Sequence, residues 1–409
     1  MAESRKDNKG RKLKDGERQR SDGRYEFRYT DPLTGKRAGI YDRDLSSLRQ
    51  KERELQRQME KGLLTAGEMR NATLNEFYER YMQIIQVDET TRSNYKGLWK
   101  NHVKDSIGRM KLIDILPSHV KTFYSDMTKK GYANGTLKVI HSVLCPVFDM
   151  ALDDCIISRN PAKDNLSGFG EEPEERYALT VEQQTNLFDF VANSRCYSKY
   201  KPMLRIMVGT SVRVGELIGL TWPDVDHSAK ELNIDHQLVY KNLGEGTRFY
   251  AKDPKTDAGI RIIPMTGEVK QAFTKQKEYQ FMLGIDHDVE VEGYKNFVFT
   301  SKSGRPLAPN AINKILLNIV NAYNKQERKL AEKENRKPDL MPDISAHILR
   351  HTDCTRMAES GMDPKVLQYI MGHEDASTTM NVYNHISSLD RVKKEMERIE
   401  NLKSSKRAI

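Results

Sequence analysis

Cysteine is scarce in this chain. The 409 residues include four cysteines, and they show neither Cys-x-x-Cys spacing nor the close framework of a disulfide-built domain. Small secreted domains depend on such frameworks, so this class is excluded. We expect reduced thiols in a cytoplasmic protein. The four residues are Cys145, Cys155, Cys196 and Cys354.

Long apolar runs are missing as well. No stretch approaches the roughly 18 consecutive apolar residues of a membrane span. The first six residues hold no apolar signal core. We therefore expect no membrane contact and a protein that stays in the cytoplasm.

Motifs for nucleotides and metals are not evident either. The chain has no G-x-x-x-x-G-K-[ST] phosphate loop. His347 and His351 are spaced as zinc ligands on a helix, but the glutamate of His-Glu-x-x-His is missing and no third ligand is evident. We expect no cofactor and no metal, with zinc at this histidine pair as the minor alternative.

The chain does carry an excess of positive charge. Lys and Arg number 67 against 58 Asp and Glu, which gives a formal net charge of +9. Residues 1–40 hold twelve basic and seven acidic side chains, so over half of the excess lies in the first tenth of the chain. This balance favours a polyanionic partner, and the length leaves room for two or three domains.

Side chains suited to phosphate chemistry gather between residues 347 and 383. The sequence His-Ile-Leu-Arg-His places His347, Arg350 and His351 on one face of a helix, with Cys354 one turn further. An imidazole and a guanidinium on one face can point toward one ligand.

Helix signals position the remaining side chains of this stretch. Asp363, followed by proline, predicts the start of a second helix, and Gly372 predicts its end. His373 then lies directly after a helix end. Ser377 can cap a third helix that presents Tyr383 close to the other side chains.

The order His-x-x-Arg, Gly-His and then a tyrosine resembles the signature of the tyrosine recombinase, or lambda-integrase, family. An earlier arginine of the family lies in Thr-Gly-x-Arg-x-Gly-Glu, and residues 210–216 read Thr-Ser-Val-Arg-Val-Gly-Glu, so Arg213 matches it. A family lysine in a β-hairpin is matched by Lys255. Two positions depart from the pattern, because Ser211 replaces the usual glycine and Asp353 stands where an apolar or aromatic residue is common.

The resemblance implies two arginines that bind the phosphate and a tyrosine that attacks it. Arg213 and Arg350 would neutralise the charge on the non-bridging oxygens, and His373 would donate another hydrogen bond. Tyr383 would be the nucleophile and His347 its base.

The resemblance also implies a general acid. Lys255 would protonate the leaving 5′ oxygen, with Lys252 as the nearby alternative. Glu216 and His351 are expected to support the site, Glu216 by orienting a cation. The resulting set of catalytic residues is Arg213, Lys255, His347, Arg350, His373 and Tyr383.

Integrases of Tn916-type conjugative transposons are the members that this chain resembles most. The likeness implies excision and insertion of a mobile element through a 3′-phosphotyrosyl intermediate and a Holliday junction. The implied partners are double-stranded DNA at the element ends and target site, three further copies in a homotetramer on DNA, and a small excisionase. The protein would work in the bacterial cytoplasm, associated with DNA.

Other interpretations stay open at this point. Taken singly, Tyr383 is typical of a core tyrosine and Arg213 of a surface ion pair. A type IB topoisomerase-like enzyme would share the tyrosine chemistry but reseal the same strand. A non-catalytic architectural DNA-binding protein could be built from the same domains.

We expect an α+β multidomain chain. Residues 1–66 should form an arm-type DNA-binding domain with a small three-stranded sheet and one helix. Residues 72–168 should form an all-helical core-binding domain. A mainly helical catalytic domain with a small antiparallel sheet should cover 174–390, followed by a helical tail over 391–409 that packs on a neighbouring copy or on its own domain.

Periodicity and turn residues predict the elements within these domains. The acidic, proline-containing segment 171–175 is expected to be an interdomain linker. The expected helices cover 44–61, 134–152, 181–191, 202–210 and 213–220, with another after a cap at Thr90 or Thr91, and the expected strands cover 17–20, 24–29, 37–41, 232–240, 249–252 and 260–263.

Seven basic residues are expected to contact DNA. Two lie in the expected N-terminal sheet, and strands of this kind can read DNA. Four repeat at every fourth position of one helix and would follow a phosphate backbone, although such a repeat is also typical of a solvated helix face. The seven are Arg24, Arg28, Arg92, Lys96, Lys100, Lys104 and Lys138.

Overall fold

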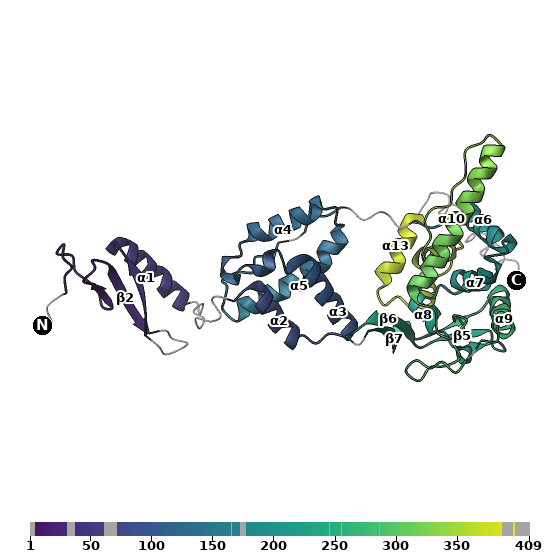
Figure 1. Ribbon diagram of the computed structural model, residues 1–409, viewed down its shortest axis with the longest axis horizontal. Coiled ribbons are helices and arrows are strands. Elements are labelled where there is room, and N and C mark those ends of the chain that lie inside the picture. Colours follow the sequence, from purple (N-terminus) through teal and green to yellow (C-terminus); the bar gives the residue numbers. More distant parts are fainter. Residues whose placement is uncertain are drawn as a thin grey trace. The chain divides into compact units, whose positions relative to one another are not determined.

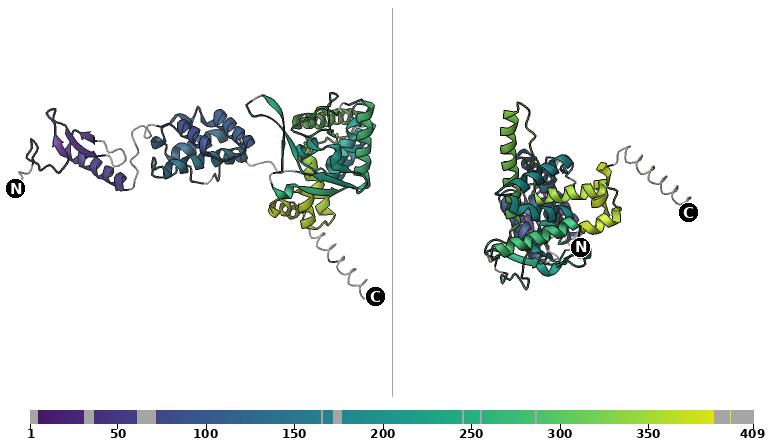
Figure 2. Two further views of the ribbon diagram at one scale, coloured as in Figure 1. Left: turned by 90° about the horizontal axis from the view of Figure 1, so that it is seen from below. Right: turned by 90° about the vertical axis from the view of Figure 1, so that its right-hand side faces the viewer.

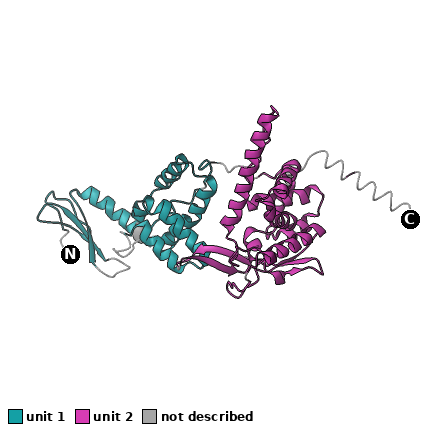
Figure 3. Cartoon of the chain, turned by 45° about the vertical axis from the view of Figure 1, so that its right-hand side comes forward, with its two compact units in different colours: residues 1–174 teal, residues 175–409 magenta. Residues whose placement is uncertain are grey.

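The computed structural model forms two compact units, Met1–Glu174 (unit 1) and Glu175–Ile409 (unit 2), which Figure 3 distinguishes by colour. The structure describes residues 5–30, 37–60, 72–164, 166–171, 177–244, 246–254, 256–285, 287–386 and 396. Of the expected linker, this leaves residue 171, and of the expected tail, residue 396. The domain boundaries therefore remain predictions.

Unit 1 begins with a three-stranded antiparallel sheet of order β1-β2-β3. Helix α1 (Leu45–Glu60) packs against it, as Figure 1 shows. Leu45, Leu48 and Leu55 recur on one helix face and are buried with Tyr25 and Phe27 of the sheet. The expected sheet and helix are thereby confirmed; the strands are β1 (Glu17–Gln19), β2 (Tyr25–Thr30) and β3 (Arg37–Asp42).

The rest of unit 1 is helical, as expected, and has a core of its own. Trp99 stacks on Tyr78 with ring centroids 3.8 Å apart and donates its indole N–H to Asn75. The elements are α2 (Leu74–Ile84), α3 (Glu89–Leu98), the π-helical turn η2 (Trp99–Val103), the 3-10 turns η3 (Ile107–Arg109) and η4 (Leu112–Asp114), α4 (Pro117–Lys129) and α5 (Asn134–Asp153).

One local expectation in this helical part is wrong. Asp88, and not Thr90 or Thr91, caps α3, because its carboxylate accepts from the backbone N–H groups of both threonines. His141 on α5 is half-buried and hydrogen-bonded to the hydroxyl of Tyr124, which holds the ring against α4.

Helix α5, with 20 residues, is long and apolar enough to cross a membrane by length and mean composition alone. However, one face of α5 carries core residues of unit 1, which identifies it as a core helix; these residues are Leu137, Ile140, Val143, Leu144, Val147, Phe148 and Ala151.

Unit 2 contains mostly helices, with one large core. Figure 1 shows its two small antiparallel sheets along the lower side of these helices. The helices are α6 (Val181–Asn193), α7 (Lys201–Thr210), α8 (Val214–Gly219), α9 (Gly267–Met282), α10 (Pro309–Lys333), α11 (Ala346–Glu359), α12 (Pro364–Met371) and α13 (Ala376–Ile386), and the 3-10 turns are η5 (Ser198–Tyr200), η6 (Trp222–Asp224) and η7 (Asp257–Gly259).

The expected strand over 232–240 is two strands in different sheets. The strand is interrupted at Asp235 and His236. There the His236 ring is buried and hydrogen-bonded to the Gly219 carbonyl at 2.8 Å. One sheet has the order β4-β5-β8, and the other is the β6-β7 ribbon, which extends from the helices of unit 2 in Figure 2. The strands are β4 (Val225–Asp226), β5 (Glu231–Ile234), β6 (Gln237–Asn242), β7 (Thr247–Lys252) and β8 (Arg261–Pro264).

Candidate active site

The turn between α7 and α8 positions the first arginine. Helix α7 ends at Ser211, which has the left-handed conformation with φ of 52°. Arg213 then serves as the N-cap residue of α8. The Glu216 carboxylate accepts from the Arg213 backbone N–H and from its guanidinium, both at 2.8 Å. The start of α8 thus fixes Arg213 at both its main chain and its side chain.

The end of α12 holds three arginines with three consecutive carbonyl groups. The Ile370 carbonyl accepts from Nε of Arg261 at 2.7 Å, and the Gly372 carbonyl accepts from Nη2 of Arg213 at 2.7 Å. Between them, the Met371 carbonyl accepts from Nη2 of Arg350. The last carbonyls of a helix have no partner within the helix and form the negative end of its dipole, so they suit cations.

The Glu216 carboxylate lies among these cations. Glu216 accepts from Nη1 of Arg213 at 2.8 Å and from Nη2 of Arg261 at 2.9 Å, and it is 3% exposed. Burial would raise its pKa, but the hydrogen bond and charge of Arg261, with the charge of Arg213, lower the pKa to about 2. Glu216 is therefore ionised at neutral pH and offsets one of three positive charges.

Arg350 is also buried in this site. It is 4% exposed, and its Nη1 donates to the Ser211 carbonyl while Nη2 donates to that of Met371. Burial and the nearby charge of Arg213 lower its pKa to about 9, so it stays protonated at neutral pH. Two helix ends, those of α7 and α12, therefore orient this guanidinium.

Three of the predicted catalytic residues line one groove of about 400 Å³: Arg213, His347 and Arg350. The opposite wall comes from β6, including Gln237 and Tyr240. His347, on the first turn of α11, is exposed. A groove that combines two guanidinium groups with an imidazole can bind an oxyanion and exchange a proton beside it.

His373 lies directly after the Gly372 cap, as expected. Burial lowers its pKa, and the positive charges of Arg350, Arg213 and Arg261 lower it further, to about 4. The ring is therefore neutral at pH 7. Its Nδ1 is 2.9 Å from the Thr379 hydroxyl, which can donate to it and leave the Nε2 hydrogen for an external acceptor.

Tyr383 is held differently from the sequence-based expectation. Its hydroxyl donates to the Met362 carbonyl, and the residue is 9% exposed within the apolar cluster of α11, α12 and α13. It does not line the groove of Arg213, His347 and Arg350, among the residues that the structure describes. The side chains of the stretch 347–383 are therefore not all gathered on one groove.

The helix that carries Tyr383 also begins differently. It was expected to be capped by Ser377, but Asp375 accepts from the Ser377 backbone N–H at 2.8 Å, and α13 begins at Ala376. The early start places Thr379 on the first turn of α13, where it reaches His373.

Lys255 lies outside the described residues. Its flanking strands, β7 and β8, pair with β6 and β5 respectively, so the described part of the chain does not show the expected hairpin between β7 and β8. Lys252 is half-buried at the end of β7, opposite Gln237. His351 is half-buried on α11 and is not one of the groove residues.

Sequence reasoning missed Arg261. Its side chain is fully buried on β8, where it bonds to Glu216, the Gly259 carbonyl and the Ile370 carbonyl. The available signal was an arginine between isoleucines at an inward position of a strand, where a charge needs a buried partner. Sequence reasoning also left Ser211 and Asp353 as two separate departures, but the Ser211 hydroxyl donates to the Asp353 carboxylate.

The predicted DNA-contact residues of unit 1 differ in what they contact. Arg24 bonds to Asp22, and Arg28 bonds to Glu26, with both arginine side chains more than half exposed. Arg92 donates from Nη1 to the Met82 carbonyl and from Nη2 to the Ile85 carbonyl at 2.7 Å, so it caps the end of α2. The remaining four are exposed; they are Lys96, Lys100, Lys104 and Lys138.

The expected stripe of four basic residues is therefore uneven, because Arg92 already donates to two carbonyls while the other three side chains are exposed. The π-helical turn η2 also interrupts its four-residue repeat, since the Lys104 backbone N–H donates to the Trp99 carbonyl five residues back, at 2.8 Å.

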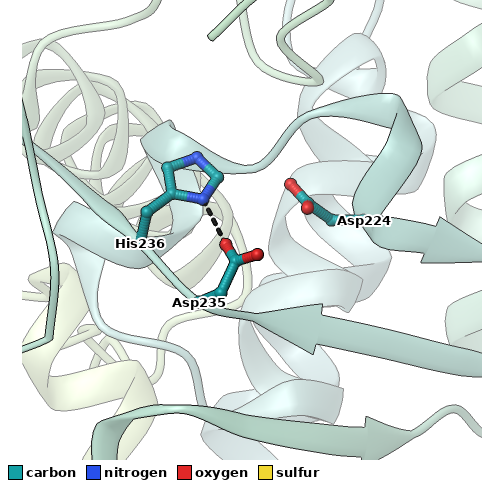
Figure 4. A group of neighbouring side chains, drawn as sticks. All are labelled: Asp224, Asp235 and His236. Carbon is teal, nitrogen blue, oxygen red and sulfur yellow. Dashed lines mark hydrogen bonds and ion pairs between the residues drawn. The ribbon is translucent and has the colours of Figure 1, made fainter. Parts of the chain in front are cut away.

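Asp224, Asp235 and His236 form the one group of three potential metal ligands among the described residues, with ligand atoms within 4.8 Å of one another (Figure 4). Each of the three side chains already has a hydrogen-bond partner. His236 bonds to Asp235 and to the Gly219 carbonyl, and Asp224 accepts from Thr221 at 2.7 Å. These bonds hold the end of η6 and the break between β5 and β6, and both ring nitrogens of His236 are in use.

Family comparison agrees with this geometry. Residues 178–389, which include the groove and α11 to α13, match the Phage integrase family. The chain belongs to this family of tyrosine recombinases. Within unit 1, residues 1–59 match the DNA binding domain of Tn916 integrase, and residues 73–128 match the N-terminal SAM-like domain of phage integrases.

Individual relatives extend the similarity over the whole chain. The transposases of transposon Tn916 from Enterococcus faecalis and of Tn1545 from Streptococcus pneumoniae are each 34% identical, with 100% of both chains covered. A solved structure of the Tn1549 transposon integrase with a circular intermediate DNA is 31% identical, with a TM-score of 0.70 over 80% of this chain and 99% of that chain. This chain is thus a tyrosine recombinase of the Tn916 integrase type.

Proposed function

We propose that this recombinase excises and inserts a mobile element by cutting DNA with Tyr383 and rejoining it to a new partner strand. The observation that carries this proposal is the cluster of Arg213, Arg261 and Arg350 at the end of α12, with Arg213 and Arg350 on the groove beside His347. The three guanidinium groups around the Glu216 carboxylate suit a DNA phosphate.

The phosphate would bind to Arg213 and Arg350. In the transition state of phosphoryl transfer, negative charge grows on the non-bridging oxygens, and donors fixed in advance stabilise it there. The helix-end carbonyls and Glu216 supply that fixation. His373, neutral at pH 7, would donate from Nε2 to the same oxygens.

Tyr383 would attack the phosphate and release a free 5′ hydroxyl. The phenol proton of Tyr383 would pass to His347. Lys255 would protonate the leaving 5′ oxygen, with Lys252 as the alternative acid. Because the Tyr383 hydroxyl donates a hydrogen bond to the Met362 carbonyl, α13 would have to move before Tyr383 could attack. The 3′-phosphotyrosyl bond conserves the energy of the broken phosphodiester bond, so a second strand can be joined without ATP.

Recombination would need four copies on two duplexes, which exchange strands in two rounds through a Holliday junction. Element ends and a target site would be the DNA partners, and a small excisionase would direct the reaction. In support, a second solved structure of the Tn1549 integrase, 31% identical, is a complex with transposon right end DNA. The protein would work in the bacterial cytoplasm. The arm-type domain, which is the first part of unit 1, would bind DNA.

A nicked suicide duplex carrying the element end tests the proposal. Wild type should form a covalent protein–DNA adduct, and Tyr383→Phe should form none while still binding the duplex. Tyr369→Phe is the matched control, because Tyr369 lies on α12, is 52% exposed and uses its hydroxyl only as acceptor for the Ile262 N–H in the described contacts. An adduct with Tyr383→Phe would refute the assigned nucleophile.

The same assay separates the remaining alternatives. No adduct with any variant would favour a non-catalytic architectural protein. Adduct formation and relaxation of supercoils without exchange between two sites would favour a type IB topoisomerase-like enzyme. Exchange between two marked duplexes is the expected result.

A further inference from the structure

Ser211 contacts the arginine cluster through its main chain and α11 through its side chain. It is completely buried and adopts the left-handed conformation, with φ of 52° and ψ of 23°. Its carbonyl accepts from Nη1 of Arg350, and its hydroxyl donates to Oδ2 of Asp353. Since a left-handed residue other than glycine costs about 1 kcal/mol or more, the two contacts must hold this turn against an unfavourable backbone.

Asp353 lies on α11 three residues after Arg350, and therefore on the same side of that helix. It is half-buried, and burial raises its pKa to about 7 although the Ser211 hydrogen bond and the Arg350 charge lower it. A carboxyl group in that environment needs a donor, and the Ser211 hydroxyl is the donor in this structure.

We propose that Ser211 and Asp353 form a positioning pair that fixes the turn after α7, so that the Ser211 carbonyl orients the Arg350 guanidinium toward the scissile phosphate. The inference rests on the proposed function, because it assigns the pair a role in phosphate binding by Arg350. Neither residue touches the phosphate, and neither takes part in proton transfer. Their effect passes through one carbonyl to one guanidinium.

The two residues should be energetically coupled. Removing one partner leaves the other buried without its hydrogen bond, whereas replacing both with apolar groups removes the problem. Ser211→Gly keeps the left-handed turn without strain but leaves the Asp353 carboxylate without a donor. Asp353→Leu leaves the Ser211 hydroxyl without an acceptor.

Single-turnover cleavage of the suicide duplex measures this coupling. We expect Ser211→Gly and Asp353→Leu each to lower the cleavage rate about tenfold or more, and the double variant to cleave at least tenfold faster than Asp353→Leu alone. Asp353→Asn keeps an acceptor and should cleave several-fold faster than Asp353→Leu. Glu359→Leu, an exposed carboxylate replaced on the same helix, is the matched control and should cleave at the wild-type rate.

A second substrate identifies the action through Arg350. In a duplex with a methylphosphonate at the scissile position, the reacting group has lost its negative charge and depends less on the guanidinium. The defect of Asp353→Leu relative to wild type should therefore shrink at least several-fold on this duplex, whereas a general loss of structure would lower both rates alike. Duplex binding and thermal unfolding of each variant provide the folding check.

The outcomes separate the pair from the proposed function. Additive defects of the two single substitutions, or an equal defect on both duplexes, would overturn the positioning pair while wild-type adduct formation left the function intact. Absence of an adduct with wild type would overturn the function. If the Asp353→Leu protein does not fold, comparison of Ser211→Ala with Asp353→Asn and their double variant decides the coupling by the same criterion of additivity.

Discussion

Gly372 is a residue whose backbone and surroundings both require the absence of a side chain. It ends α12 in the left-handed conformation, with φ of 60°. A Cβ atom built there would lie 2.9 Å from Nη1 of Arg261 and 3.1 Å from the Ala258 carbonyl. The carbonyls of residues 370–372 reach three arginines only if this turn is kept, so the cluster depends on one glycine.

Gly372→Ala should therefore displace Arg261 and weaken the cluster. We expect the free energy of unfolding to fall by about 1–3 kcal/mol from left-handed strain and collision, and DNA cleavage to fall at least tenfold. Chemical denaturation and the suicide-duplex assay measure the two effects. Gly267→Ala is the control, because a Cβ atom on Gly267 meets nothing within 4 Å and its φ is ordinary; equal effects of the two substitutions would contradict the assignment.

The sequence predicted some site residues well and others poorly, for physical reasons. His347 and Arg350 lie one turn apart on α11, so their shared face followed from short-range spacing, whereas Arg213, which lines the same groove, was identified by its match to the family motif. Arg261 could not be found in this way, because its partner Glu216 is 45 residues away and comes near only in the folded unit. The hydroxyl position of Tyr383 depends on the path of the chain after α11, which no local motif specifies.

At the scale of elements, the end of α2 and the start of α3 are joined by Arg92. Its guanidinium satisfies two carbonyls at the C-terminal end of α2, and Asp88 satisfies N–H groups at the start of α3. A basic side chain used in this way stabilises the helix pair. Lys96, one turn further, is exposed and remains available to a phosphate backbone.

Arg92→Ala should therefore affect mainly the stability of the protein, and Lys96→Ala mainly its binding to DNA. We expect Arg92→Ala to lower the free energy of unfolding by about 1–3 kcal/mol, because the two carbonyls lose charged donors. Lys96→Ala should change stability by less than about 0.5 kcal/mol but lower the slope of log affinity for duplex DNA against log salt concentration by about 1. Denaturant titration and binding at several salt concentrations give both quantities, and the reverse pattern would show that Arg92 is the DNA contact.

Helices were predicted more reliably than the ends and breaks of elements. The stripe of Leu137, Ile140 and Leu144 specifies a helix by itself, and α5 matches the expected bounds within one residue. By contrast, the break between β5 and β6 comes from a bond between His236 and Gly219, 17 residues earlier. The π-helical turn at Trp99 accompanies the stacking on Tyr78 of a different helix, which periodicity does not report.

At the scale of the whole molecule, each unit has its own cores, and the titratable groups with the largest effects on the active site lie in unit 2. Two of them should act on stability with opposite signs. The pKa of His373 is lowered to about 4 in the folded protein, and that of Asp353 is raised to about 7.

For His373, the unfolded chain binds a proton below its ordinary pKa of about 6.5 while the folded chain does not until about 4, so stability falls as pH drops through this window. For Asp353, the folded chain keeps its proton up to about 7 while the unfolded chain loses it near 3.8, so stability falls as pH rises through that window. For Glu216, whose pKa is lowered from 4.5 to about 2, the stabilising contribution is complete above about pH 4.5 and is lost as pH falls from there to about 2.

Unfolding of unit 2 at pH 7 and pH 5 should separate the two groups. Relative to wild type, His373→Asn should gain stability at pH 5 against pH 7, and Asp353→Asn should lose it, each by about 1 kcal/mol after allowance for solvent at half-buried sites. Glu359→Gln, at an exposed position of α11, is the control and should show the wild-type difference. A shift of the same sign in both variants would contradict the assigned pKa directions.

The buried position of Tyr383 has a consequence for the safety of the host chromosome. An enzyme that carries its own nucleophile and needs no ATP could nick any DNA duplex that it binds. Here the Tyr383 phenol lies in an apolar cluster and its hydroxyl donates a hydrogen bond to the Met362 carbonyl, and Tyr383 is not among the residues that line the groove of Arg213, His347 and Arg350. In the role proposed for Tyr383, cutting is withheld until assembly at the correct ends supplies the free energy to release it.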